Sequence, residues 1–407
     1  MMSGSRVFWQ GSSVSELRLP VFDERERTDA SPASHEESSF TFLNRIAGDF
    51  WHHARQLIEN WCSHLPTQVA YADMRGRLRS RNDSQFNSAF LELYLHEALL
   101  RSGHTVEIHP HLESTERQPD FYAEKDGVGF YIEAISPGVG KEKASDIARK
   151  NRFIDVVNRL DEPDFLLSLR SLTVGRGEPR AARLRTDLRR WLRSIDPDAM
   201  SDRENAPRFT WAREDWSAEF SAIPVRKDGR RVDGTERRAI AIYAHEPAEW
   251  VNDATTITKA LDAKHGEYGA LDKPFVIAVG LFIQDTDRWH STNAFYGPER
   301  IILSDGEDAR SVRQGDGYFG APQNWQHTNV SGVLLVNQLQ PYHVHKAETT
   351  LWVHPGSSLP ISPFGMPGDT VNLDGNQVTT TSGAIPANEL FGLPPEWPPG
   401  DPWPSKG

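Results

Sequence analysis

The stretch from Gln118 to Ser136 limits the fold most, because it contains two β-like runs separated by a tight polar turn. Asp126-Gly127 suits a two-residue hairpin turn, in which both central residues need positive φ. Counting outward from that turn places Asp120 directly opposite Glu133. The sequence therefore predicts a β-hairpin whose two carboxylates have Cβ atoms roughly 5 Å apart.

These two carboxylates need a compensating positive charge if both lie inside the folded protein. Glu133 belongs to the apolar run 130–135, where an unpaired carboxylate is costly to bury. Hard cations such as Mg²⁺ take carboxylate oxygens as ligands and complete their shell with water and phosphate. The hairpin is therefore a candidate for half of a metal site. The alternative is two solvated edge residues, in a chain with 57 acidic side chains.

The segment before the hairpin predicts a helix over 83–102 and a strand over 104–109. Ser88, Glu92 and His96 recur every four residues, so they form one polar stripe on a mostly apolar helix. Either the stripe reaches a functional site, or it is the solvent-facing edge of an amphipathic helix.

This order of elements resembles the PD-(D/E)XK nuclease superfamily, which has the restriction-endonuclease-like fold. Glu92 matches the acid of the helix, Pro119-Asp120 matches the Pro-Asp motif, and Glu133 matches the acid of the third element. The resemblance covers residues 81 to about 164, and within it the chain looks like a group of largely uncharacterised bacterial proteins.

The resemblance implies a metal-dependent nuclease. Asp120, Glu133 and the carbonyl of Ala134 are expected to hold Mg²⁺ or Mn²⁺, and Glu92 to bind a second ion or a metal-bound water, with His96 supporting it. The expected substrate is nucleic acid, DNA rather than RNA, and the expected activity is that of an endonuclease. The expected fold is α/β, with a mixed central sheet flanked by helices, an N-terminal helical extension and a C-terminal β-rich extension. The oligomeric state is left open, and a homodimer is one of the alternatives.

The chain departs from the family at Ile135, where the family has a lysine that orients the attacking water. A cation from the following helix is the expected replacement, and the candidates are Lys141, Lys143, Lys150 and Arg152. Lys150 is the prediction, because its helix is expected to pack beside the hairpin. The alternative is a catalytically inactive protein of the nuclease fold that serves as a nucleic-acid-binding or scaffold module.

The length of 407 residues predicts two or three structural units. The expected division is an N-terminal extension with one amphipathic helix (1–80), a nuclease-like core (81–282), a loop- and strand-rich part (283–390) and a Pro-rich tail (391–407). The tail is expected to be extended and polyproline-like.

The formal net charge of −12 disfavours nucleic acid as a partner, since affinity for phosphates comes from clustered Lys and Arg. Its distribution offsets this objection, because residues 141–193 contain fourteen basic and eight acidic side chains. The predicted helix over 180–195 is the best candidate for a duplex-facing surface, and a solvated helix face is the alternative. The alternating arginines of 75–81 are either a phosphate-contacting ribbon or a connector.

Other features exclude some classes of protein. Cys62 is the single cysteine, so neither a disulfide framework nor a cysteine metal cluster is expected. No apolar run approaches the length that spans a membrane and no signal pattern begins the chain, so a cytoplasmic protein with no membrane partner is expected. A Gly-x-Ser-x-Gly elbow and a Walker phosphate loop are also missing from the sequence.

Overall fold

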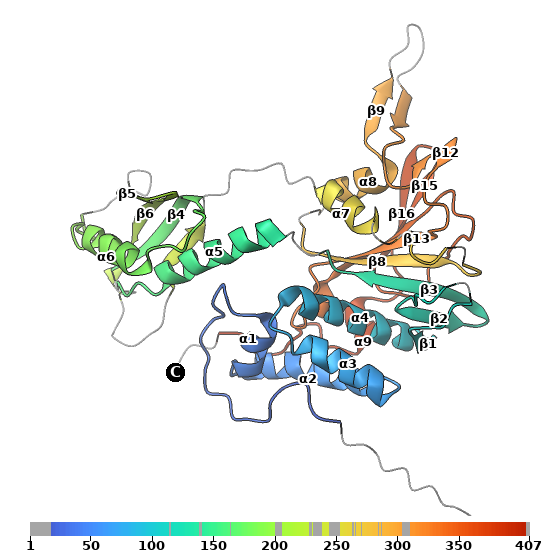
Figure 1. The fold of residues 1–407 in the computed structure, drawn as a ribbon, viewed down its shortest axis with the longest axis horizontal. Helices are drawn as coiled ribbons and strands as arrows, with labels where there is room; N and C mark the ends of the chain where they lie inside the picture. Colours follow the sequence, from blue (N-terminus) through green and yellow to red (C-terminus); the bar gives the residue numbers. More distant parts are fainter. Residues whose placement is uncertain are drawn as a thin grey trace, which may run out of the picture.

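The computed structural model describes residues 18–403, apart from 114, 138–140, 163, 200–205, 228–229, 231–237, 244–252, 263, 265, 270, 284, 286 and 303–309. An eight-stranded mixed sheet forms the larger part of the molecule, and a four-stranded sheet forms a second lobe (Figure 1). The expected α/β class, with a large mixed sheet flanked by helices, is confirmed.

The eight-stranded sheet has the order β1-β2-β3-β8-β13-β14-β15-β16. Its strands are β1 (Thr105–Ile108), β2 (Phe121–Lys125), β3 (Val128–Ile135), β8 (Phe275–Leu281), β13 (Gly332–Asn337), β14 (Glu348–Val353), β15 (Asp369–Asp374) and β16 (Gln377–Thr381). The central strands β3, β8 and β13 run parallel. Apolar residues run through β8 and β13, as expected for parallel strands covered on both faces.

The predicted hairpin is confirmed in β2 and β3. Asp126 and Gly127 have φ values of 53° and 77°, and Phe121 pairs with Ile132. Both central residues therefore adopt the positive φ that a two-residue turn requires. The register continues outward as counted from the sequence, so Asp120 precedes β2 at the level of Glu133.

Helices cover both faces of this sheet. On one face lie α1 (Ser39–Arg45), α2 (Asp49–Ser63), α3 (Gln68–Leu78), α4 (Asp83–Arg101) and α9 (Ala387–Phe391). On the other lie α7 (Asp253–Asp262) and α8 (Trp289–Tyr296) (Figure 1). Alternate residues of β3 and β8 supply two separate apolar cores, one beneath α4 and one beneath α7 and α8.

The second lobe is inserted between β3 and β8. It contains α5 (Lys141–Asn158), β4 (Phe165–Thr173), α6 (Ala181–Leu192), β5 (Arg208–Arg213), β6 (Trp216–Pro224) and β7 (Ile240–Tyr243). Both helices pack on one face of the sheet β5-β6-β4-β7 and share an apolar core with it. The prediction that the helix after the hairpin packs beside the hairpin is wrong, because α5 packs against α6 and β7.

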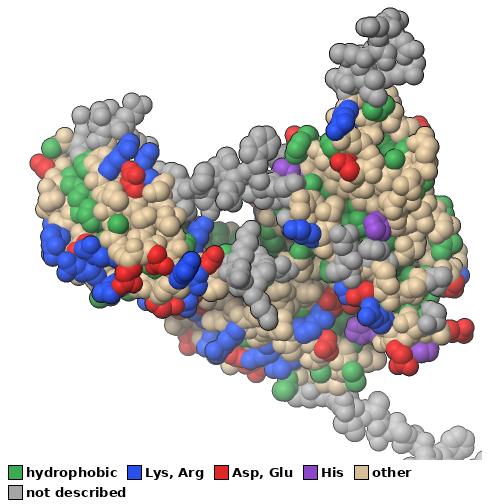
Figure 2. Space-filling model, turned by 45° about the horizontal axis from the view of Figure 1, so that its top comes forward, with side chains coloured by type: hydrophobic (Ala, Val, Ile, Leu, Met, Phe, Trp, Pro, Cys, Tyr) green, Lys and Arg blue, Asp and Glu red, His purple; other side chains and the backbone are tan. Residues whose placement is uncertain are grey.

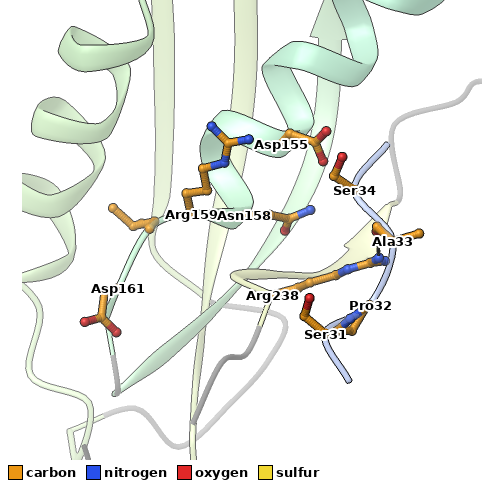
Figure 3. A pocket seen from close by; sticks show the side chains of 10 residues that line it. Ser31, Pro32, Ala33, Ser34, Asp155, Asn158, Arg159, Asp161 and Arg238 are labelled. Carbon is orange, nitrogen blue, oxygen red and sulfur yellow. Dashed lines mark hydrogen bonds between the residues drawn. The ribbon is translucent and has the colours of Figure 1, made fainter. Parts of the chain in front are cut away.

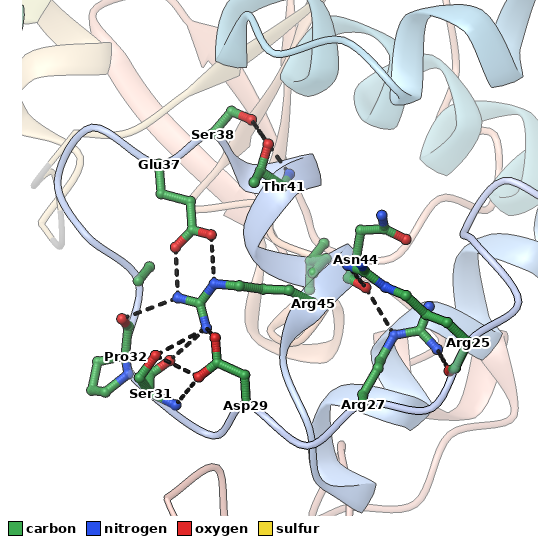
Figure 4. A network of polar contacts seen from close by, with 12 residues as sticks. Arg25, Arg27, Asp29, Ser31, Pro32, Glu37, Ser38, Thr41, Asn44 and Arg45 are labelled. Atoms are coloured by element: carbon green, nitrogen blue, oxygen red, sulfur yellow. Dashed lines mark hydrogen bonds and ion pairs between the residues drawn. The ribbon is translucent and has the colours of Figure 1, made fainter. Parts of the chain in front are cut away.

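An N-terminal segment, residues 29–38, joins the two lobes. The carboxylate of Asp155 in α5 accepts hydrogen bonds from the backbone N–H groups of His35 and Glu36 at 2.9 and 3.1 Å. Arg238 donates to the carbonyl of Ala33 beside a cavity of about 440 Å³ (Figure 3). Arg45 of α1 holds the segment from the other side through Asp29 and Glu37 (Figure 4).

Several predicted boundaries need correction. The described residues of the N-terminal part contain three helices rather than one. The predicted boundary at residue 282 divides the large sheet, because β13–β16, which follow residue 282, belong to the same sheet as β3 and β8. The region 283–328 also contains α8 and the short strands β9 (Glu299–Ile302), β10 (Arg310–Arg313), β11 (Gly320–Ala321) and β12 (Asn324–Trp325).

The predicted extended tail instead docks on the N-terminal helices. Trp51 Nε1 of α2 donates to the carbonyl of Pro402 at 3.0 Å. The indole of Trp403 packs against Phe42 and Trp51, with ring centroids 6.4 and 5.5 Å away. Trp397 Nε1 donates to the carbonyl of Pro341. These contacts explain why the tryptophans of a Pro-rich segment are ordered.

Candidate active site

Asp120 lies at the edge of the sheet where β3 ends. The backbone N–H of Ala134 donates a hydrogen bond of 2.7 Å to its Oδ2, and the backbone N–H of His109 donates to its carbonyl at 3.0 Å. His109 itself has a φ of 51°, and its Nε2 lies 3.9 Å from Oδ1 of Asp120. The main chain and one carboxylate oxygen therefore fix Asp120, while the other oxygen faces His109.

Glu92 approaches the same edge from α4. Its side chain is buried, and Oε2 accepts a hydrogen bond of 2.5 Å from Arg77 of α3. Burial raises the pKa of Glu92, and the guanidinium of Arg77 opposes that shift. His96, one turn further along α4, is also buried. The polar stripe predicted from the sequence thus faces the interior rather than solvent.

Glu133 points to the opposite face of the sheet, because its neighbours Ile132 and Ala134 belong to the core beneath α4. Lys264, just after α7, places its ammonium 2.7 Å from Oε1 of Glu133. The hydroxyl of Tyr268 donates to Oε2 at 2.5 Å. Both carboxylate oxygens of Glu133 therefore have a donor from the same short segment of chain.

Lys264 is charged in this setting. Burial by itself would lower the pKa of its ammonium, but hydrogen bonds to Glu133 and to Glu267 at 3.0 Å outweigh burial, so the pKa is raised. Ile135, where the resembling family has lysine, lies on the same face of β3 as Glu133. Lys264 thus brings a cation from another part of the chain to the face that a lysine at position 135 would occupy.

Asp120 is repelled by both of the other predicted acids. Burial raises the pKa of Asp120 to about 8, and repulsion from Glu92 and Glu133 adds to the shift. The N–H of Ala134 and the charge of Arg77 oppose it. Of the three acids, Glu92 and Asp120 line one cavity, whereas Glu133 acts on Asp120 from the opposite face of the sheet.

A cavity of about 640 Å³ opens beside Asp120 and Glu92. Its polar lining comprises Thr67, Asp73, Glu92, His96, Glu107, His109 and Asp120, and its apolar lining includes Val69, Met74, Val106, Ile108 and Phe121. Burial lowers the pKa of His96 to about 4, so its imidazole is neutral at pH 7, and its buried Nδ1 has no hydrogen-bond partner. The cavity thus combines acidic groups, an apolar wall and an unsatisfied imidazole nitrogen.

The donor chemistry of this site fits a hard divalent cation, because burial and repulsion from Glu92 and Glu133 raise the pKa of Asp120 and a cation would relieve the repulsion. In the part of the chain that the structure describes, however, no group of three or more His, Cys, Asp or Glu side chains is arranged to hold a metal ion as it stands. The contacts of Glu133 with Lys264 and Tyr268 account for its separation from the other two acids.

No family model, curated protein or solved structure matches this chain. The geometry of the site is therefore the basis for assigning a function. Among the described residues, no helix is long and apolar enough to cross a membrane.

Lys150, the cation predicted from the sequence, lies half-buried in α5. That helix belongs to the second lobe, where Arg152 contacts Glu36 and Glu178. The side chains of Lys141 and Lys143 lie outside the described residues. Lys264 contacts one of the three acids, Glu133, as Arg77 contacts Glu92.

Arg77, Lys264 and Tyr268 are site residues that the sequence analysis did not identify. Arg77 belongs to the alternating arginines of 75–81, which are neither a phosphate-contacting ribbon nor a simple connector. Arg75 donates to the carbonyl of Pro20 at 2.8 Å, and Arg79 donates to Val21 and Asp23. These arginines hold an N-terminal segment and one acid of the site, and no local pattern in the sequence distinguishes them from solvated residues.

Proposed function

We propose that this chain is a metal-dependent nucleic-acid phosphodiesterase, a DNA endonuclease with a restriction-endonuclease-like core. The observation that carries the proposal is that Glu92 and Asp120 line one cavity, where burial and repulsion from Glu92 and Glu133 raise the pKa of Asp120 to about 8. Strongly shifted pKa values beside a cavity are typical of functional sites. A helix acid, a hairpin and an acid on the third element also match the order of that nuclease core.

Asp120 and Glu92 would hold Mg²⁺ or Mn²⁺, with Glu133 and the carbonyl of Ala134 as further ligands. A bound metal ion lowers the pKa of water and stabilises negative charge on a phosphate. The residues of the chain supply the remaining functions. The N–H of Ala134 orients Asp120 through a 2.7 Å hydrogen bond, and Arg77 holds Glu92 in place and favours its ionised form.

Lys264 would replace the lysine that the resembling family carries at the position of Ile135. Its ammonium is charged, and it has three N–H donors for two carboxylates. Binding of a divalent cation to Glu133 would therefore free an ammonium beside the phosphate. Tyr268, whose pKa burial and Glu133 raise, stays protonated and keeps donating to Glu133.

The test is cleavage of supercoiled, linear and single-stranded DNA, and of RNA, with Mg²⁺ or Mn²⁺. Wild-type protein is expected to cut DNA, and Asp120→Asn is expected to lose at least about 100-fold in rate. Asp126→Asn is the matched control, because it changes the same residue type in the same hairpin at a turn position where asparagine tolerates positive φ. Undiminished cleavage by Asp120→Asn would remove the assignment.

A second candidate is an inactive nuclease-fold protein that binds nucleic acid or acts as a scaffold. The observation in its favour is that Glu133 already has a donor on each oxygen, so Lys264 could replace the metal permanently. Calorimetry with Mn²⁺ separates the two candidates. The enzyme is expected to bind Mn²⁺ with micromolar to millimolar affinity that Asp120→Asn abolishes, whereas the scaffold is expected to bind none.

A further inference from the structure

Five arginines gather on the outer side of the second lobe: Arg183, Arg189 and Arg190 of α6, Arg193 at its C-cap, and Arg213 of β5. We call this set the arginine face. The side chains of its members are 40–69% exposed. Lys and Arg side chains cluster visibly on this lobe in the space-filling view (Figure 2).

Two nearly buried carboxylates hold the arginine face in position. Asp187 lies within 4 Å of Arg183, Arg190 and Arg213, at 3.2, 3.6 and 3.9 Å. Glu162 lies 3.4 Å from Arg189 and 3.5 Å from Arg193. Both carboxylate side chains are only 10% exposed, so the acids lie beneath the guanidinium groups rather than between them and solvent.

This arrangement leaves an excess of positive charge at the surface. Five guanidinium groups share two carboxylates, so three positive charges remain in excess within the set. A shared carboxylate also restricts the position of each arginine side chain, and each guanidinium keeps some of its five N–H donors unused. The arginines are therefore both oriented and able to bind a further anion.

The surface also contains a hollow that fits a phosphate. A depression of about 370 Å³ is lined by Arg189, Arg190, Arg193, Thr186 and Ser194. The hydroxyls of Thr186 and Ser194 donate to carbonyls of α6 and can still accept. Guanidinium groups bind phosphate oxygens in a bidentate geometry, which makes such a hollow better suited to phosphate than to a monovalent halide.

The chemistry of α6 points to a polyanion rather than a lipid surface. Its leucines, Leu184, Leu188 and Leu192, are fully buried in the core of the second lobe. Among the described residues of α6, no large hydrophobic side chain is exposed. A helix that inserts into a membrane interface needs a free apolar face, so the arginine face would have only its charge to offer a bilayer.

We infer that the arginine face binds the sugar–phosphate backbone of duplex nucleic acid, without reading its sequence. The twelve residues of α6 span roughly 18 Å, a length over which a duplex carries on the order of ten phosphate charges. This inference rests on the proposed nuclease function and deepens it, because it assigns substrate binding to the inserted lobe and chemistry to the larger sheet.

The test is fluorescence anisotropy of a labelled 20-base-pair duplex in EDTA, where metal-dependent cleavage cannot occur. The variant Arg190→Gln/Arg193→Gln removes one arginine from each shared carboxylate. It is expected to weaken binding at least about tenfold and to reduce the slope of log affinity against log salt by about 2, since each lost phosphate contact removes about one unit.

Arg170→Gln/Arg208→Gln is the matched control. These two arginines also share one carboxylate, Glu219, at 3.6 Å each. They lie on the face of the four-stranded sheet away from α5 and α6, since Trp211 on the strand of Arg208 and Phe220 next to Glu219 point into the core. The control is expected to bind duplex within about twofold of wild type.

Equal binding by wild type and the arginine-face variant would overturn the inference, as would a loss of the same size in the control. Absence of duplex binding by wild type in low salt would also overturn it. A polyglutamate that competes as well as DNA at equal charge would show that the face takes acidic proteins instead. Failure of the nuclease proposal is distinguishable, because Asp120→Asn would then change neither cleavage nor binding.

Discussion

The Asp120 site and the arginine face arrange charge in opposite ways. Around Asp120, buried acids repel one another, and the cations Arg77 and Lys264 contact Glu92 and Glu133 but not Asp120. At the arginine face, buried acids lie beneath a larger number of exposed cations. The first arrangement leaves a negative site open to a cation, and the second leaves a positive surface open to an anion. A nuclease of the proposed type would need both, and the two lie in separate lobes.

The comparison teaches that the effect of a buried carboxylate on stability depends on the charges around it. Asp187 stabilises the fold because three guanidinium groups surround it, as expected for a paired buried charge. The charged form of Asp120 lowers stability, because it is buried and two further acids repel it. The same substitution should therefore have opposite effects at the two positions.

The largest expected effect concerns the cation of the site. Lys264→Gln should lower the cleavage rate about 100-fold or more, because it removes the ammonium that, among the described residues, contacts one of the three acids. Lys150→Gln, at the position favoured by the sequence, should cleave at nearly the wild-type rate. The measurement is single-turnover cleavage of linear DNA, and the reverse outcome would restore Lys150 as the catalytic cation.

The second effect tests the contrast between the two aspartates directly. Asp187→Asn should destabilise the second lobe by about 1–2 kcal/mol, since three arginines lose their shared counter-charge. Asp120→Asn should instead raise stability at pH 8 in EDTA by roughly 1 kcal/mol, since it removes a buried and repelled charge. Urea denaturation of both variants measures this, and a shift of the same sign in both would break the comparison.

The third effect is stabilisation by metal. With a dissociation constant near 1 mM, 10 mM Mg²⁺ should stabilise wild-type protein by about 1.4 kcal/mol. Asp120→Asn should lose this increment, whereas Asp187→Asn should keep it, because its carboxylate lies in the arginine face. Thermal melts with and without Mg²⁺ give the result. Retention of the increment in Asp120→Asn would place any bound cation elsewhere.

The smallest effect concerns His96 in the cavity wall. Burial lowers its pKa to about 4 in the folded protein, against about 6.5 when unfolded, so the unfolded chain binds the extra proton first. The contribution of His96 to stability is therefore present above pH 6.5 and is lost as the pH falls toward 4. His96→Leu should flatten the decrease in stability between pH 7.5 and 5.5 by on the order of 1 kcal/mol. An unchanged pH profile would contradict the buried, neutral state of this imidazole.

The hairpin and the helix before it were predictable from the sequence, because they depend on local signals. Asp126-Gly127 determines the turn, and the alternation of β3 then determines which residues face each other. Lys264 and Arg77 were not predictable, because each reaches its partner through the packing of a separate helix. Lys264 lies 131 residues after Glu133, and no pattern near Lys264 in the sequence indicates that its partner is a carboxylate.

The division into domains failed for a related reason. A domain boundary was expected at residue 282, where the periodicity of apolar residues stops. That periodicity indicates local secondary structure and gives no information on which strands pair. β8 pairs with β3 and β13 across long intervening segments, and only the folded chain shows that the inserted lobe separates strands of one sheet. The apolar alternation of β4 to β6 likewise gave no indication that they form a sheet of their own.

The docking of Trp403 on Phe42 and Trp51 has a consequence for synthesis of the protein on the ribosome. The first helices leave the exit tunnel early, yet the side chains that complete their packing are made some 350 residues later. Until then, the indole of Trp51 and the ring of Phe42 lack part of their cover. The nascent chain therefore exposes part of this aromatic surface for most of translation, and exposed surfaces of this kind are bound by chaperones.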